Sequence, residues 1–325
     1  MSRFAPWQQA VLNRALAALA EARLGHALLL VGPAQLGKLD VALALAQRLL
    51  CSSPDANSNL ACGRCRSCQL FAADTHGDFK HVTFEPNDKG DKLRTEISVE
   101  QIRKLGQWFS LTPQLGGAQV ALIEPADALN IASANALLKT LEEPAPNRFL
   151  LIVTSRPGRL PATIRSRCQR LEFRLPGREV ALDWLAAKGH SRDRAIPALD
   201  AALGHPGLAE QWLSQGGLAL REQVRSDLNA VAEGRASPVE LSQAWLADEQ
   251  AELRLRFSAD LALEAAETRL GAVAPRRAGL KPPADFSRLS DWFDAVNRTR
   301  DQLRAPLRHD LILAGLLHQW RSMFQ

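Results

Sequence analysis

The fold is decided by residues 28–39, which run Leu28-Leu-Leu-Val-Gly32-Pro-Ala-Gln-Leu-Gly37-Lys38-Leu39. The short apolar run at the start is typical of a buried strand, and the residues after it fit the phosphate-loop pattern Gly-x-x-x-x-Gly-Lys. Backbone N–H groups at the start of the following helix would surround a phosphate, and Lys38 would add a cation. The stretch therefore predicts a P-loop fold; the alternative is an ordinary glycine-rich turn between a strand and a helix.

Two positions that ATP hydrolysis needs have lost their chemistry. Leu39 stands where a working loop has serine or threonine, whose hydroxyl holds Mg²⁺ against the phosphates. A second apolar run, 120–123, should end in two acids, one for Mg²⁺ and one for the attacking water, but it is followed by Glu124 and Pro125. We therefore expect no ATP hydrolysis by this chain alone, and ATP binding is doubtful. The phosphate-binding residues that remain are Gly32, Gly37 and Lys38.

The composition is that of a globular protein with two or three domains. The chain has 325 residues, of which 46% are apolar and 23% charged, with a net charge of +5. This mildly basic balance is compatible with nucleic acid nearby but does not demonstrate it. No apolar run approaches the roughly 20 residues of a membrane helix, and the N-terminus has no apolar signal core. We expect a cytoplasmic protein without a membrane segment.

Strands and helices alternate over the first 170 residues, as an α/β domain with a parallel sheet requires. After 175–177, Leu-Pro-Gly, the strand pattern disappears and the remaining chain has helical patterns. The predicted strands are 28–31, 120–123 and 149–153, and the predicted helices among them are 39–50 and 132–143. We predict three domains: an α/β P-loop domain over 1–172, a small helical domain over 173–215 and an all-α C-terminal domain over 216–325. A basic run among prolines, 276–281, is expected to be a solvated loop, with DNA contact as the alternative.

Four of the five cysteines are clustered within a short polar segment, at Cys51, Cys62, Cys65 and Cys68. Two Cys-x-x-Cys steps share Cys65, which lets a tight turn direct thiolates at one point. Four thiolates would close a tetrahedral site around a structural Zn²⁺ and leave no position for water, while iron–sulfur ligation is the main alternative. Zinc ligation supplies on the order of 10 kcal/mol to the folding of such a module, here about 51–68. The fifth cysteine, Cys168, is expected to be a small buried side chain.

Two further stretches resemble one family. Residues 132–144, Ala-Ser-Ala-Asn-Ala-Leu-Leu-Lys-Thr-Leu-Glu-Glu-Pro, are similar to the hallmark helix of bacterial clamp-loader subunits, which belong to the AAA+ class of P-loop proteins. Residues 160–168 are similar to the Ser-Arg-Cys segment of the same family, which also carries a zinc module after the P-loop helix. The resemblance covers residues 1 to about 215; the C-terminal third matches only in length and helicity. The resemblance implies an AAA+ domain, a helical lid domain and a C-terminal collar domain for oligomerisation.

The family contains ATPase subunits, gamma and tau, that keep the Gly-Lys-Ser/Thr sequence and the acidic pair, and a subunit that has lost both. With Leu39 and Pro125 in these positions, this chain resembles the subunit that has lost both features. Gly207 is a third departure, because the ATPase members carry at that place an arginine that touches the nucleotide. Thr154 or Ser155 occupies the position of a polar phosphate sensor. The resemblance thus implies a non-catalytic subunit of the DNA polymerase III clamp loader, which helps load the sliding clamp onto primed DNA.

The resemblance also implies a role for Arg167 and a set of partners. Each Ser-Arg-Cys segment of the family reaches into the ATP site of the neighbouring subunit, so Arg167 would be an arginine finger supplied in trans; the alternative is a pair with a local carboxylate. The implied partners are gamma or tau and the delta subunit, with the sliding clamp and primer–template DNA contacted through the complex. Two other functions stay open: an ATP-hydrolysing loader subunit with a degenerate P-loop, and a zinc-dependent DNA-binding module of another repair ATPase complex.

Overall fold

A computed structural model of the chain forms two compact units, Met1–Trp184 and Leu185–Gln325. The structure describes residues 4–56, 59–87, 89–269, 279–281, 283, 285–303 and 307–325. Helix α7, Arg178–Ala187, contains the division between the units, which falls after the boundary at 172 that the sequence suggested. The division into an α/β domain, a lid and a C-terminal domain stays a prediction, and the two units are described separately.

The first unit is built on one parallel sheet with the strand order β2-β3-β4-β1-β5, which confirms the predicted α/β class. The strands are β1 Ala27–Val31, β2 Phe79–Val82, β3 Gln119–Ile123, β4 Arg148–Thr154 and β5 Gln169–Glu172. All residues of β1 are buried because β4 and β5 pair with its two edges and helices cover its two faces. The phosphate loop thus leaves the interior of the sheet at the carboxyl end of a buried strand.

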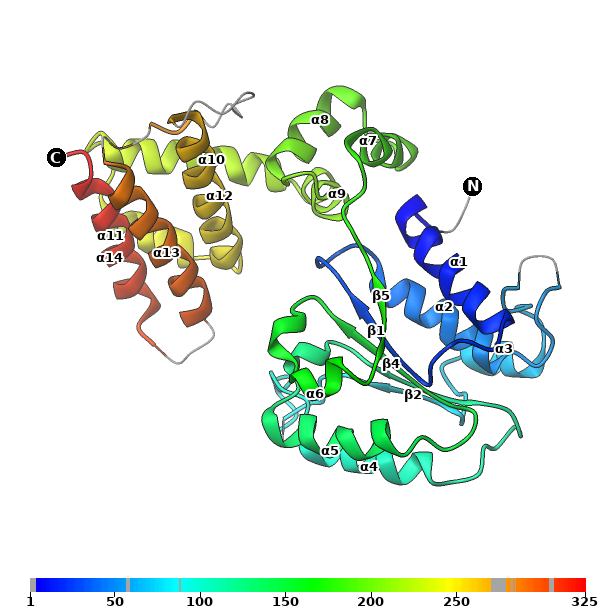
Figure 1. The fold of residues 1–325 in the computed structure, drawn as a ribbon. Helices are drawn as coiled ribbons and strands as arrows, with labels where there is room; N and C mark the ends of the chain where they lie inside the picture. The colour runs from blue at the N-terminus through cyan, green and yellow to red at the C-terminus, as the bar shows by residue number, and fades with distance from the viewer. Residues whose placement is uncertain are drawn as a thin grey trace. The chain divides into compact units, whose positions relative to one another are not determined.

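The helices of this unit form two layers, one on each face of the sheet (Figure 1). Successive side chains of a strand point to opposite faces, so Leu28 and Leu30 pack under α1 and α2, whereas Leu29 and Val31 pack against α4 and α5. The helices are α1 Pro6–Ala20, α2 Lys38–Leu50, α3 Arg66–Ala72, α4 Val99–Phe109, α5 Ile131–Glu142 and the short α6 Ala162–Arg165. Two 3₁₀ turns, η1 Ala126–Ala128 and η2 Pro157–Arg159, follow β3 and β4.

The three strands predicted from the sequence are all present, and the two that it did not predict are the edges of the sheet. Strand β2 reads Phe-Lys-His-Val and β5 reads Gln-Arg-Leu-Glu, neither of which is a continuous apolar run. An edge strand has one side facing solvent and tolerates polar side chains, so its sequence carries a weaker signal than a central strand.

The second unit is entirely helical over the described residues. Four tryptophans are fully buried in it, and the indole N–H groups of Trp292 and Trp320 donate to the carbonyls of Leu316 and Leu228, at 3.0 and 2.8 Å. These side chains therefore serve the core, as expected from their positions in apolar helical patterns. The helices after α7 are α8 Arg192–Ala201, α9 Pro206–Ser214, α10 Gly217–Ala232, α11 Pro238–Leu246, α12 Ala251–Arg269, α13 Phe286–Gln302 and α14 His309–Ser322.

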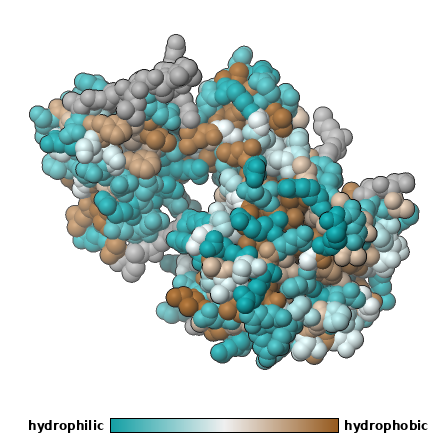
Figure 2. All heavy atoms as spheres, viewed as in Figure 1, coloured by the Kyte–Doolittle hydropathy of each residue, from teal (hydrophilic) through white to brown (hydrophobic). Residues whose placement is uncertain are grey.

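The visible surface is largely hydrophilic, with hydrophobic side chains gathered in small patches (Figure 2). Among the described residues, no helix combines the length and apolar character needed to cross a lipid bilayer. The first half of the basic run 276–281, including Arg276 and Arg277, lies outside the described residues, so the expectation of a solvated loop stays a prediction.

Candidate functional site

Backbone conformation requires both glycines of the phosphate loop, and packing against the Phe173 backbone is a second reason at Gly32. Gly32 has φ of 144°, and a Cβ there would lie 2.3 Å from the carbonyl oxygen of Phe173. Gly37 caps α2 with φ of 74°, in the left-handed region that favours glycine. A Cβ on Gly37 would lie 1.6 Å from the side-chain nitrogen of Gln8. The loop therefore needs its glycines for reasons that are independent of nucleotide.

Lys38 is buried and is held by the loop itself. Its Nζ donates to the carbonyl oxygens of Gly32 at 2.9 Å and Pro33 at 2.6 Å. Burial lowers the pKa of Lys38 to about 8, although the negative charges of Asp127 and Glu124 act in the opposite direction. The cation that a P-loop offers to phosphate thus already has two oxygen partners within its own loop.

Leu39 and Pro125 line the same cavity, which has a volume of about 240 Å³. Its walls come from the phosphate loop and from the carboxyl ends of β3 and β4, where a nucleotide's phosphates lie in a P-loop protein. Thr154, at the predicted sensor position, is part of this wall, and its hydroxyl donates to Asp127 Oδ1 at 2.8 Å. Two apolar side chains therefore face the space in which an active ATPase would place Mg²⁺ and the attacking water.

Residues of α1 hold the loop in a way that the sequence did not indicate. The indole N–H of Trp7 donates to the carbonyl of Leu36 at 3.1 Å, and the amide of Gln8 donates to the same oxygen at 3.2 Å. Trp7 also packs edge-on against Trp184, with ring centroids 5.2 Å apart. These contacts join positions far apart in the chain, and no local pattern in residues 4–8 predicts them.

The buried ammonium of Lys38 predicts a pH dependence of stability. Lys38 has a pKa of about 8 in the folded protein and an ordinary value of 10.5, so between these two pH values the unfolded chain binds more protons. The cost of burying the charge is present below pH 8 and is relieved as the pH rises toward 10.5. We expect the free energy of unfolding of the wild type to rise over this window relative to Lys38→Met, measured by urea unfolding. A constant difference between the two proteins would contradict this expectation.

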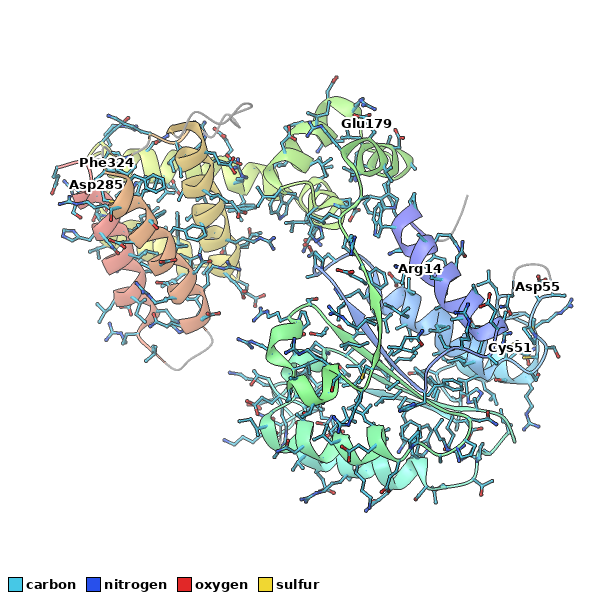
Figure 3. The ribbon with its side chains drawn as sticks, viewed as in Figure 1. Arg14, Cys51, Asp55, Glu179, Asp285 and Phe324 are labelled. Carbon is cyan, nitrogen blue, oxygen red and sulfur yellow. The ribbon has the colours of Figure 1, made fainter. Side chains whose placement is uncertain are left out.

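The four clustered cysteines converge on one point at the end of α2 and the start of α3, where Figure 3 labels Cys51. Their sulfur atoms all lie within 4.8 Å of one another, and the sulfur of Cys51 lies 3.6 Å from that of Cys62 and 3.9 Å from that of Cys65. A tetrahedral site with Zn–S bonds of about 2.3 Å requires sulfur atoms about 3.8 Å apart. The four thiols are therefore close enough to share a single metal ion, with the more widely spaced sulfur atoms moving together as they bind it.

The surroundings of two of the sulfur atoms, those of Cys62 and Cys65, favour thiolates. The backbone N–H groups of Arg64 and Cys65 lower the pKa of Cys62. For Cys65, burial opposes ionisation, but hydrogen bonds from Ser52 and Cys68 outweigh it and lower the pKa to about 5. Burial raises the pKa of Cys68 to about 12, so the thiolate form of this residue requires a cation beside it.

Ser67 and His76 support the cysteine site, and the sequence did not single out either of them for this role. Nδ1 of His76 accepts from the N–H of Asp78 at 3.0 Å, so its Nε2 carries the proton and donates to Ser67 Oγ at 2.8 Å. Ser67 Oγ in turn donates to the carbonyl of Leu50 at 2.6 Å, beside Cys51. This buried chain of hydrogen bonds joins the cysteine site to the loop before β2.

Arg167 follows α6 and lies on the surface, while the residues on either side of it anchor its backbone. Ile164 and Cys168 are buried in the core between the sheet and the α4–α5 layer, and burial raises the pKa of the Cys168 thiol to about 11. The guanidinium of Arg167 donates to the carbonyl of Thr163 at 3.0 Å and pairs with Glu142, with a nitrogen–oxygen distance of 2.8 Å. The local carboxylate that the sequence left as an alternative partner is therefore Glu142, at the end of α5.

The parallel sheet, the phosphate loop after β1 and the helical second unit define a P-loop protein of the AAA+ class. Over 96% of this chain, the structure is similar to a DNA polymerase III gamma subunit-related protein from Thermotoga maritima, all of which is covered, with a TM-score of 0.50 and 16% identity. At that identity the likeness concerns the fold alone.

The sequence comparisons are more specific. The family model for the DNA polymerase III delta subunit matches residues 7–176. The delta' subunit of DNA polymerase III from Pseudomonas aeruginosa is 38% identical, over 75% of this chain and 72% of that protein. The delta' subunit from Escherichia coli is 33% identical over 97% of this chain and 94% of that protein. The chain belongs to the family of DNA polymerase III delta' subunits.

Proposed function

We propose that this protein is a non-catalytic subunit of the DNA polymerase III clamp loader, and that it acts on ATP only at the site of a neighbouring subunit. Family membership supports its place in this assembly. The cavity beside the phosphate loop supports the loss of its own chemistry, and this observation carries the proposal. Leu39 offers no ligand for Mg²⁺ there, and Pro125 offers no base for water. The sequence resemblance implies that the partners are gamma or tau and delta, and that the sliding clamp and primed DNA are reached through the complex.

Arg167 is the residue that we propose to act in trans, as an arginine finger toward the ATP bound by an adjacent gamma or tau subunit. A planar, permanently charged guanidinium can neutralise the charge that spreads over a transferred phosphoryl group. Two features of the structure support this role: the backbone around Arg167 is anchored by buried neighbours, and the Arg167 side chain is 38% exposed. The residue can therefore reach a neighbouring molecule without a change in the fold of its own unit.

The cysteine cluster is proposed to hold a structural Zn²⁺ through Cys51, Cys62, Cys65 and Cys68. The close sulfur spacing supports one ion in place of an iron–sulfur cluster of several ions. With four protein ligands, the ion would have no open position for substrate, so it would stabilise the loop between α2 and α3 and take no part in ATP chemistry.

A turnover assay tests the proposed function directly. We expect the isolated protein to show no Mg²⁺-dependent ATP hydrolysis above a protein-free control, and to co-purify with gamma or tau when the two are mixed. The isolated gamma or tau subunit is the positive control for the assay. Clear hydrolysis by the isolated chain would favour the alternative of an active subunit with a degenerate P-loop. Failure to join the gamma or tau assembly would instead exclude the clamp-loader assignment.

A further inference from the structure

The last residue of α5 is the partner that holds Arg167 in the structure. Glu142 ends the helix, and its carboxylate lies 2.8 Å from a terminal nitrogen of Arg167. The carbonyl of Thr163, one turn earlier on the Arg167 side, accepts a second bond from the guanidinium. These two contacts direct the side chain toward its own subunit.

The ion pair is too exposed to be a strong structural link. The side chains of Glu142 and Arg167 are 48% and 38% exposed, and pairs of this kind contribute little to stability because water and salt screen them. The segment is held instead by buried apolar side chains, since Leu160 and Ile164 are 2% and 0% exposed. Breaking the pair would leave the backbone in place and change only which conformations the Arg167 side chain populates.

We propose that Glu142 is a positioning residue that holds Arg167 in a resting state and competes with the neighbouring subunit's nucleotide for the guanidinium. This inference rests on the proposed finger role of Arg167. A triphosphate carries more negative charge than one carboxylate. It therefore displaces Glu142 when the two subunits come into register, that is, when they align so that Arg167 reaches the neighbour's ATP site. While they are out of register, Glu142 keeps the finger away from solvent anions and from the neighbour's site. The weakness of the pair is then an advantage, because a strong pair would hold back the finger in the assembled state.

Removing the resting partner should raise the activity of the assembled loader. In the reconstituted complex with gamma or tau and delta, we expect Glu142→Gln to increase the ATPase rate in the absence of DNA by about two- to fivefold, the gain expected from freeing a weakly held side chain. The DNA-stimulated rate should change much less, because register is then already reached. Glu143→Gln is the matched control. It removes the same charge one residue further on, and Glu143 forms no ion pair with the residues that the structure describes.

A double substitution separates competition for Arg167 from a general change of charge. If Glu142 acts through Arg167, then Glu142→Gln has no effect in an Arg167→Ala background. An increase that persists in that background would overturn the inference. So would a Glu142→Gln rate equal to those of the wild type and Glu143→Gln. If Arg167→Ala itself leaves the rate unchanged, the finger role fails, and the competition fails with it.

A second measurement on the full-length isolated chain does not depend on ATP hydrolysis. In the resting state, the ion pair should slow rotation about the Cζ–Nε bond of Arg167, which NMR of arginine side chains detects. We expect faster rotation in Glu142→Gln than in the wild type and in Glu143→Gln. Equal rotation rates in all three proteins would show that Glu142 does not hold the Arg167 side chain. This result would overturn the inference whatever the ATPase results, and it would leave the proposed finger role of Arg167 standing.

Discussion

Replacing Arg167 with alanine is expected to leave the clamp-loader complex assembled and to slow DNA-stimulated ATP hydrolysis at least about tenfold at the one site that Arg167 enters. Arginine fingers supplied in trans contribute about 10³–10⁵ to phosphoryl transfer at the site that they enter. The total rate of the complex should fall by less, because ATP sites between other subunits of the loader do not receive this residue. Single-turnover ATP hydrolysis by the reconstituted complex, with primed DNA and clamp, measures the effect. Size-exclusion chromatography checks that assembly is unchanged.

Arg165 provides a matched control for this experiment, because it is an exposed arginine two residues away on α6. We expect Arg165→Ala to keep most of the wild-type rate. Arg167→Lys should recover little, since lysine keeps the charge but loses the planar fork that contacts two phosphate oxygens at once. Equal rates for Arg165→Ala and Arg167→Ala would refute the trans role of Arg167. The resting contact with Glu142 would then be an ordinary surface ion pair.

Removal of the metal is expected to have the second large effect. We expect one Zn²⁺ per chain, and its removal by a strong chelator, or by Cys65→Ser, to unfold the segment between α2 and α3. Metal ligation supplies on the order of 10 kcal/mol to small sites of this type. The polar loop that begins at Ser52 has few apolar side chains with which to stabilise itself. Limited proteolysis followed by mass spectrometry should show new cleavage between residues 51 and 75, together with a loss of bound zinc.

Cys168 serves as the control for the metal experiment. Cys168 is buried in the core on the α4–α5 side of the sheet and is not one of the four clustered thiols. Cys168→Ala should therefore keep one zinc per chain and the wild-type cleavage pattern. A full zinc content in Cys65→Ser would contradict the assignment of this ligand. If the purified protein contained iron in place of zinc, the four cysteine ligands would stand and the assignment of the metal as zinc would be wrong.

The central part of the fold could be predicted because its signals are local. Buried strands such as 28–31 and 120–123 must be apolar on both faces, and the glycine loop has a recognisable spacing. The edge strands β2 and β5 could not be predicted in the same way, since they are short and carry polar side chains. Pairing with β3 and β1 forms these strands, and such pairing depends on residues far away in the sequence.

In the candidate site, too, the sequence predicted some features and the folded chain was needed for others. Leu39 and Pro125 show lost chemistry from their identity alone, because leucine has no oxygen and proline has no carboxylate. That both line one cavity became visible only in the folded chain, which brings the ends of β1 and β3 together. The same holds for Lys38, whose charge is evident from the sequence but whose Nζ is bound to the carbonyls of its own loop.

For Arg167, the family motif in the sequence suggested a finger but left its resting partner unnamed. Glu142 lies 25 positions earlier in the chain, and only the packing of α6 against α5 brings the two charges to 2.8 Å. The chain alone therefore determined the chemistry that each side chain can perform, including the absence of an Mg²⁺ ligand at Leu39 and the presence of four clustered thiols. The tertiary structure decided which groups meet and how exposed they are, because distance and burial, and with them pKa and the strength of a charge pair, depend on contacts between segments that are remote in sequence.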